Sequence, residues 1–443
     1  MKYLTIYQQL KTDILTNNYN EGTKLPSLRI LAKTYECSIQ TIQQVMALLV
    51  EDNLIYAKNR SGYYIIQTDK LVTPLIDDHI DFSAQHLSWA NFPYADFQSC
   101  LKQAVHNYQK DLFIYGSSQG LPALITTLTK WLAGRHIYTN EDSVFITTGT
   151  QQALFILSQL TFPNRKATIL IESPSYHLML SLLSIQSHPF ITINRDASEL
   201  DFEQLETIFR ENEIKFFYTT SRLSNPLGLS YSENEKKQLV ALAKKYDVYI
   251  IEDDYLADYV IETNNLPLHY YDTDNRVIYL KSFSKIMFPG LRIGACLLPE
   301  KLVACFQAYR SLMEIDSAIF SQAALDIYIK SQMFDAHINH LKKLLVQKNN
   351  AFKQTVLAQP NQSVIPIQQF TSAKTFLQLP KDLPNSLFLK KLAAENIKLA
   401  SLNRHYLPNK VPNRAIYGIE LFNVTPQQIT QGLSKILSLV TTY

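Results

Sequence analysis

The sequence predicts an α/β protein in two parts: a small helical unit at the N-terminus, followed by a large, doubly wound and mostly parallel sheet. Three observations support this prediction. The 443 residues exceed what one hydrophobic core usually spans. Apolar residues recur at helical spacing over about the first 50 residues. From residue 79 onward, short apolar strands alternate with helical stretches.

Composition narrows the class of protein. With 46% hydrophobic residues the chain is globular, and its net charge of +3 neither requires nor excludes a nucleic-acid partner. The four cysteines have neither disulfide-like nor metal-like spacing, which is typical of a reducing compartment. The first residues lack an apolar signal core, and no apolar run approaches the roughly 20 residues that cross a bilayer. We therefore expect a cytoplasmic protein without a metal site.

The first unit should contain three helices and a strand pair. Apolar residues at four-residue spacing predict a helix over residues 6–15. A second helix should begin at Ser27 and a third at Ser38, because a serine can accept a hydrogen bond from a free N–H of the first turn. Residues 54–66 alternate as two strands around a tip at residues 58–62. Three helices and a β wing indicate a unit that reads DNA.

This unit resembles the winged helix-turn-helix of the GntR regulators over about the first 66 residues. The motifs are Leu25-Pro26-Ser27-Leu28-Arg29, Ser38-x-x-Thr41, and Asp52-Asn53-Leu54-Ile55 with Gly62. The resemblance implies that Arg29 contacts a phosphate, that the third helix enters the major groove, and that the wing touches the minor groove or backbone. The residues expected to contact double-stranded DNA are Ser27, Arg29, Ser38, Gln40, Thr41, Gln43, Gln44, Lys58, Arg60 and Gly62.

Two features of this unit bear on how it binds DNA. Where the family commonly has arginines in the recognition helix, this chain has Ile39 and Gln43, so we expect the base contacts to come from Gln40, Thr41, Gln43 and Gln44. Because glutamine pairs with adenine edges, we expect an A·T-rich site. Residues 1–66 contain seven lysines and arginines against five carboxylates, so a single copy should bind DNA weakly. Beyond the unit, the sequence loses periodicity and contains Pro74. We predict a DNA-binding domain over residues 1–67, a linker over 68–78 and a second domain over 79–443.

In the second domain, five candidate strands are each followed by a loop with chemically distinctive residues. The strands are residues 144–146, 168–171, 216–218, 248–251 and 277–280, and the loops contain Gly149-Thr150-Gln151, Ser175-Tyr176, Asn225-Pro226, Asp253-Asp254-Tyr255 and Lys285. Any one of these loops is more often structural than functional. Because ligands bind at the carboxyl ends of parallel strands, five such loops in order predict one pocket.

The run Ser282-Phe283-Ser284-Lys285-Ile286-Met287-Phe288-Pro289-Gly290-Leu291-Arg292 indicates what the pocket binds. Lys285 follows a predicted buried strand, two serine hydroxyls lie near it in sequence, and the Pro-Gly turn can fold Arg292 back toward them. An amine for an aldehyde, with hydroxyls and a guanidinium for a phosphate, suits pyridoxal 5'-phosphate.

The order of these loops resembles the fold-type-I aminotransferases over about residues 80–443. The resemblance implies that a smaller C-terminal subdomain accompanies the sheet. The resemblance implies that Lys285 forms a Schiff base with pyridoxal phosphate and that Asp253 pairs with the ring nitrogen. Asn225 and Tyr255 would bind the phenolic oxygen, and Tyr176 would lie against the ring. The residues expected near the phosphate are Gly149, Thr150, Gln151, Ser282, Ser284 and Arg292. The segment Tyr115-Gly116…Gly120 resembles the one that reaches the neighbouring subunit's phosphate, which implies a homodimer.

Together the two halves resemble the MocR subfamily of bacterial regulators, with two departures. The stretch 417–422 lacks the arginine that in aminotransferases holds the substrate carboxylate, although Arg404 and Arg414 lie upstream. Leu178 stands where the GABA-responsive member has an arginine, so we do not expect GABA as the effector.

Three hypotheses remain from the sequence. The first, which we favour, is a dimeric transcription regulator that senses pyridoxal phosphate or its adduct with an amino compound. The second is an active aminotransferase with an accessory DNA-binding head. In the third, the winged unit is only an assembly module.

Overall fold

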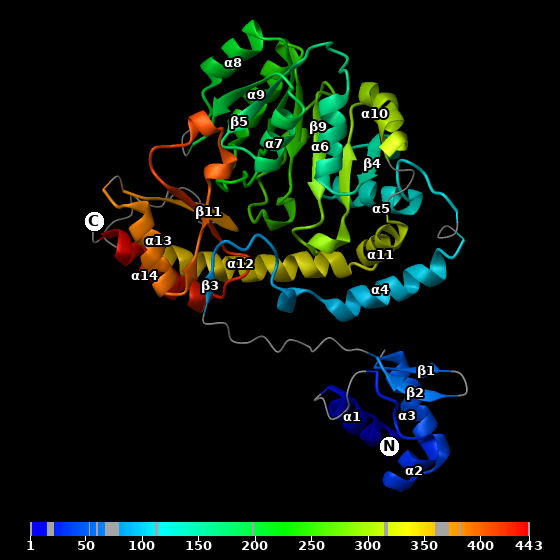
Figure 1. Ribbon diagram of the computed structural model, residues 1–443. Coiled ribbons are helices and arrows are strands. Elements are labelled where there is room, and N and C mark those ends of the chain that lie inside the picture. The colour runs from blue at the N-terminus through cyan, green and yellow to red at the C-terminus, as the bar shows by residue number, and fades with distance from the viewer. Residues whose placement is uncertain are drawn as a thin grey trace. The chain divides into compact units, whose positions relative to one another are not determined.

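The computed structural model describes residues 2–15, 22–52, 54–58, 61–66, 79–110, 114–196, 199–313, 318–358, 372–380 and 382–441. The chain forms two compact units, residues 1–78 and residues 79–443 (Figure 1). The predicted linker over residues 68–78 lies outside the described residues. Each unit is taken below by itself.

The first unit has the three predicted helices and the predicted strand pair. Its elements are α1 (Lys2–Leu15), α2 (Leu28–Thr34), α3 (Ile39–Glu51), β1 (Ile55–Lys58) and β2 (Gly62–Ile65). The strands pair antiparallel, and apolar side chains from all five elements form one core. An ion pair of 2.6 Å between Lys11 and Asp52 joins α1 to the end of α3. The helices and the wing are therefore confirmed.

The second unit is built on a seven-stranded sheet in the order β4-β10-β9-β8-β7-β5-β6. Its strands are β4 (Val144–Thr147), β5 (Thr168–Ser173), β6 (Phe190–Asn194), β7 (Ile214–Thr219), β8 (Tyr249–Asp253), β9 (Val277–Ser282) and β10 (Gly294–Leu297). All neighbours are parallel except β10, which is antiparallel to both β4 and β9. The five predicted strands are confirmed, whereas β6 and β10 were not predicted.

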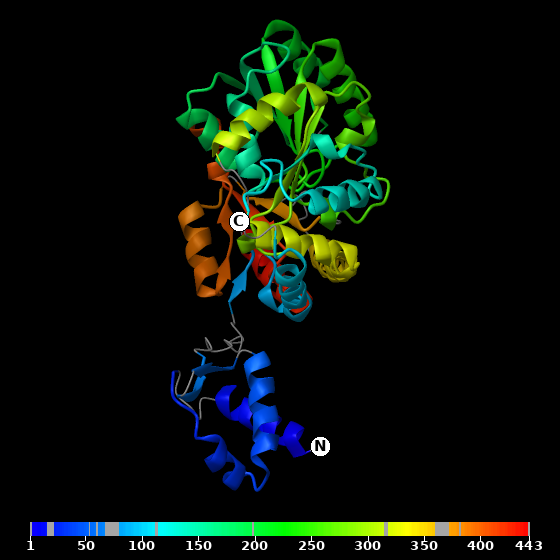
Figure 2. The ribbon, with the colours of Figure 1, turned by 90° about the vertical axis from the view of Figure 1, so that its right-hand side faces the viewer.

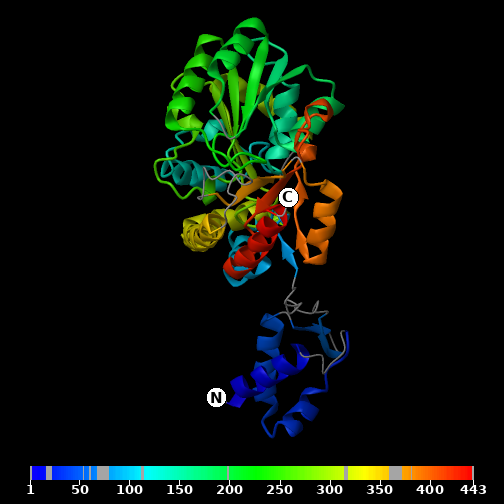
Figure 3. The ribbon, with the colours of Figure 1, turned by 90° about the vertical axis from the view of Figure 1, so that its left-hand side faces the viewer.

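Helices cover both faces of this sheet (Figures 2 and 3). Successive side chains of a strand point to opposite faces. In β9, Ile278 and Leu280 belong to the core under α6 (Thr150–Gln159), α7 (His177–Ile185) and α10 (Glu300–Met313). Tyr279 and Val277 belong to the opposite face, which is covered by α5 (Pro122–Ala133), α8 (Phe202–Glu211), α9 (Glu233–Lys245) and α11 (Ile319–Lys330). The sheet is thus doubly wound, as predicted.

A smaller part follows the sheet. Strands β11 (Lys374–Gln378), β14 (Ile416–Glu420) and β13 (Ala400–Ser401) form an antiparallel sheet, and β3 (Ile80–Asp81) pairs with β12 (Ile397–Lys398). Helices α13 (Asn385–Ala394) and α14 (Pro426–Thr441) accompany these strands. The 25-residue helix α12 (Met333–Leu357) runs from this part beneath the large sheet, near α11 and α4 (Tyr94–Asn107) (Figure 1). Across the described residues, none of the helices is long and apolar enough to span a bilayer.

Candidate functional site

A pocket of about 190 Å³ lies at the carboxyl ends of the parallel strands. It brings together eleven of the residues that the sequence singles out: Gly149, Thr150, Gln151, Tyr176, Asn225, Asp253, Tyr255, Ser282, Ser284, Lys285 and Arg292. Gln85 and His177 also line it, and neither was foreseen. Tyr115 is not among its residues and is 85% exposed within this chain.

Lys285 presents an amine that is easily deprotonated. Its Nζ donates a hydrogen bond of 2.6 Å to the carbonyl oxygen of Gln85, and the Tyr259 hydroxyl donates one of 3.0 Å to the Lys285 carbonyl oxygen. Loss of solvent and the neighbouring cation of Lys374 lower the pKa of Lys285 to about 8, with a smaller contribution from Arg404 and an opposing one from Glu420. A neutral amine is the form that attacks an aldehyde.

Asp253, the last residue of β8, offers a buried acceptor. The Tyr218 hydroxyl donates to Oδ2 over 2.8 Å, whereas Oδ1 is buried and has no partner among the described residues. Burial raises the pKa of Asp253 to about 7, against the hydrogen bond from Tyr218. Because a buried oxygen without a donor is costly, Oδ1 fits the N–H of a protonated ligand ring.

The start of α6 forms an anion cradle with Arg292. Gly149 precedes the helix with a φ of +82°, and the Arg292 guanidinium donates 2.8 Å to the carbonyl oxygen of Thr148. A Cβ at position 149 would lie 3.3 Å from a guanidinium nitrogen, so glycine suits both the backbone angle and the space. Free N–H groups of a helix start, two serine hydroxyls and a guanidinium form the donor set of a phosphate site.

A buried ion pair occupies the other end of the site. Lys374 Nζ lies 3.1 Å from the Glu420 carboxylate, 3.3 Å from the Tyr255 hydroxyl and 3.4 Å from Asn225 Oδ1. Glu420 Oε2 is buried and has no partner among the described residues. Glu420 belongs to the stretch in which the aminotransferase pattern has the arginine that binds the substrate carboxylate. This chain therefore has a negative charge close to where that pattern has a positive one.

The two upstream arginines, Arg404 and Arg414, differ in their proximity to the pocket. Arg404 is exposed, yet its charge acts on Lys285, Tyr176 and His177, which places it close to the pocket. Arg414 is also exposed and is not among the pocket residues. Lys374 was not predicted from the sequence, because it reaches the site only through the pairing of two strands that are distant in the sequence.

The predicted DNA-contacting residues lie mostly at exposed positions of the first unit. Ser38 Oγ accepts from the Thr41 N–H over 3.1 Å and begins α3, whose Gln40, Gln43 and Gln44 are exposed, whereas Thr41 is half-buried. Ser27 begins α2 in the same manner. The other exposed positions are Arg29 in α2 and, in the wing, Lys58 and its pairing partner Gly62, whose φ is +113°. Arg60 lies outside the described residues.

Fold and site together define a protein in which a winged helix precedes an aminotransferase-like domain with a set of residues suited to pyridoxal phosphate. Residues 2–65 match the gntR family of bacterial regulatory proteins, and residues 86–398 match aminotransferase class I and II. This chain belongs to the GntR-type transcriptional regulators with an aminotransferase domain, the MocR subfamily.

Individual relatives agree with this assignment. The chain is 39% identical to the uncharacterized HTH-type transcriptional regulator YcxD of Bacillus subtilis over 441 residues, 99% of each chain. It is 21% identical to the probable rhizopine catabolism regulatory protein MocR of Rhizobium meliloti, over 98% of this chain and 92% of that protein. Among solved structures, the kynurenine aminotransferase of Pyrococcus horikoshii resembles it with a TM-score of 0.73 at 22% identity, covering 83% of this chain and 92% of that one.

Proposed function

We propose that this regulator binds pyridoxal phosphate through Lys285, and that the coenzyme, alone or joined to an amino compound, changes how its winged units bind a promoter. The observation that supports this most is that Oδ1 of buried Asp253 has no hydrogen-bond partner among the described residues and lies in the same pocket as Lys285 and the anion cradle. The target promoter is proposed to belong to a gene of cofactor synthesis or amine metabolism.

Each part of the pocket has a task in this proposal. Pyridoxal phosphate supplies an aldehyde and a ring that withdraws electrons when its nitrogen is protonated. Asp253 would accept a hydrogen bond from the protonated ring nitrogen, Lys285 would supply the attacking amine, and Arg292 with the start of α6 would bind the phosphate. The Lys374 ammonium, close to Asn225 and Tyr255, stabilises negative charge on the phenolic oxygen.

The Glu420 carboxylate argues for sensing rather than turnover of α-amino acids. Beside the pocket it repels a substrate carboxylate, and its Lys374 partner is already engaged at 3.1 Å. The second candidate function, an active aminotransferase, is favoured by Arg404, because its charge reaches Lys285. Transfer of the amino group from any amino donor, lost in both Lys285→Ala and Arg404→Gln, would support this alternative.

Absorption spectroscopy tests the coenzyme. Pyridoxal phosphate is titrated into the parent, Lys285→Ala and Lys342→Met, where Lys342 is a half-buried lysine outside this pocket. We expect the visible band of lysine-bound coenzyme in the parent and in Lys342→Met, and none in Lys285→Ala. Absence of the band from all three proteins would contradict coenzyme binding.

DNA binding tests the regulation. A ligand shifts a binding equilibrium only by its difference in affinity for the two states, typically about 1 to 3 kcal/mol, or about 5- to 150-fold. We expect coenzyme-loaded and coenzyme-free protein to differ in footprint or affinity on the promoter. Identical footprints and identical regulation would show that the protein does not sense the coenzyme, although the coenzyme could still bind.

A further inference from the structure

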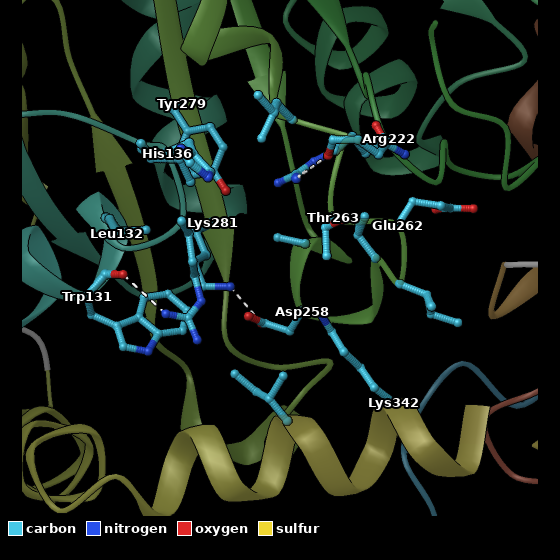
Figure 4. A pocket seen from close by; sticks show the side chains of 18 of the residues that line it. Trp131, Leu132, His136, Arg222, Asp258, Glu262, Thr263, Tyr279, Lys281 and Lys342 are labelled. Atoms are coloured by element: carbon cyan, nitrogen blue, oxygen red, sulfur yellow. Dashed lines mark hydrogen bonds and ion pairs between the residues drawn. The ribbon is translucent and has the colours of Figure 1, made fainter. Parts of the chain in front are cut away.

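A second pocket, also of about 190 Å³, lies between α5, α12 and the sheet (Figure 4). In the part of the chain that the structure describes, the two pockets have no lining residue in common. Its apolar wall includes Trp131, Val260 and Ile338, and its charged residues come from five segments of the chain. These charged residues are Arg135, Arg222, Asp258, Glu262, Lys281 and Lys342.

The alternation of side chains along the strands separates the two pockets. In β9, Lys281 lines the second pocket, whereas the next residue, Ser282, lines the coenzyme pocket. At the end of β8 the same pattern recurs, because Asp253 belongs to the coenzyme pocket and the next residue, Asp254, pairs with Arg222 of the second pocket. The second pocket is therefore a site of its own on the opposite face of the sheet.

Three of the four cations among its described lining residues already have a carboxylate partner. Arg135 pairs with Asp335 at 2.5 Å, Lys281 with Asp258 at 2.6 Å, and Arg222 with Asp254. Lys342, from α12, has neither an ion pair nor a hydrogen bond among the described residues. Figure 4 shows it reaching toward Asp258, while Glu262 points away from the cluster.

The ammonium of Lys342 thus stands among other positive charges. Burial lowers its pKa, and Arg135, Arg222 and Lys281 lower it further, while Asp258 alone opposes them. Asp258 is itself bonded to Lys281, whose side chain is 1% exposed. Among the described residues, Lys342 is thus the one of these four cations without an ion pair, although Asp258 lies near enough to act on its charge.

We propose that this pocket binds a small oxyanion, a carboxylate or a phosphate, through Lys342, with Arg135 beside it and Trp131 as an apolar wall. A cation is disfavoured because Asp258 is already paired and Glu262 is turned away. Anion binding in this pocket does not require the coenzyme, so this proposal can be correct or wrong independently of the proposed function.

Calorimetry tests the site with inorganic phosphate in one arm and acetate in the other, at fixed ionic strength, on full-length protein saturated with pyridoxal phosphate. The variants are Lys342→Met and, as the matched control, Lys343→Met, which removes the exposed neighbouring lysine of α12. We expect saturable binding of at least one anion, weakened about tenfold or more in Lys342→Met and unchanged in Lys343→Met.

The remaining outcomes are also decisive. The anion with the higher affinity identifies the ligand as a phosphate or a carboxylate. If the coenzyme does not bind, phosphate in the Arg292 cradle appears as a second site that persists in Lys342→Met. The absence of saturable binding in the parent, or equal affinities in the parent and a Lys342→Met variant with an unchanged melting temperature, overturns the proposal.

Discussion

Asp253 and Lys285 show how burial prepares single residues for one ligand. Burial raises the pKa of Asp253 to about 7, while loss of solvent and Lys374 lower that of Lys285 to about 8. Both shifts favour the neutral form of the group when the pocket holds only protein. A protonated ring nitrogen beside Asp253 would stabilise its carboxylate, and an aldehyde would consume the neutral amine of Lys285.

Asp253→Asn should weaken binding of the coenzyme. The amide keeps the shape of the side chain but loses the charge-assisted hydrogen bond that Oδ1 would accept from the ring N–H, worth about 1.5–3 kcal/mol, so the dissociation constant should rise roughly 10- to 100-fold. Fluorescence or absorption titration with pyridoxal phosphate measures it. Asp254→Asn, on the other face of the sheet, tests whether any nearby charge loss has the same effect. An unchanged affinity in Asp253→Asn would remove Asp253 from the binding site.

Lys374→Met should move coenzyme attachment to higher pH. Removal of this cation takes away a charge that lowers the Lys285 pKa, while Glu420 continues to raise it against the smaller effect of Arg404, so the pKa should rise above about 8. The midpoint of the pH dependence of attachment should therefore rise by roughly one unit. Lys374→Met/Glu420→Gln should shift it back, because the carboxylate that favours the ammonium is also gone. The initial rate of band formation across pH measures this, and a fall in the midpoint for Lys374→Met would contradict it.

At the scale of elements, the sequence predicts those helices, strands and helix caps that depend on residues close together in the chain. The five strands with distinctive loops and the cap serines Ser27 and Ser38 were located because periodicity and capping lie within a few residues of each other. The pair Lys374–Glu420 was not foreseen, because it depends on the pairing of β11 with β14 across 46 positions. The partner of Lys285 was also hidden, since Gln85 contributes a backbone oxygen that has no sequence signature.

Helix α3 gives a prediction about base reading. Gln43 is exposed on the recognition helix, so Gln43→Ala should weaken binding to the preferred site by about 1–3 kcal/mol and relax the preference at one base pair.

Arg29→Ala should weaken binding to all DNA sequences alike and reduce the slope of affinity against salt concentration by about 1. Binding to a library of operator variants at two salt concentrations separates the two effects. A change of base preference in Arg29→Ala would show that the predicted docking is wrong.

At the scale of the whole molecule, we predict that two copies of the chain are needed, both for DNA binding and for a complete coenzyme site. The chain has a net charge of only +3, so two winged units on one palindromic DNA site would supply the affinity that one unit lacks. The sequence resemblance also predicts a homodimer, because it implies that Tyr115, which is exposed in this chain, reaches the neighbouring subunit's site. Although it was predicted at the coenzyme site, this chain does not place it among the pocket residues, which is the arrangement expected of a residue that serves a neighbouring subunit.

Mixed dimers test this prediction. Tyr115→Ala should weaken coenzyme binding, and Lys285→Ala should abolish the lysine-bound band. If Tyr115 serves the partner's site, a dimer of one Tyr115→Ala chain and one Lys285→Ala chain contains one intact site, because Lys285 comes from the first chain and Tyr115 from the second. Differently tagged chains, co-expressed and purified as the mixed species, should bind one coenzyme per dimer with the parent affinity. If Tyr115 acts within its own chain, that site would keep the weak affinity of Tyr115→Ala, and the inferred contribution across subunits would be wrong.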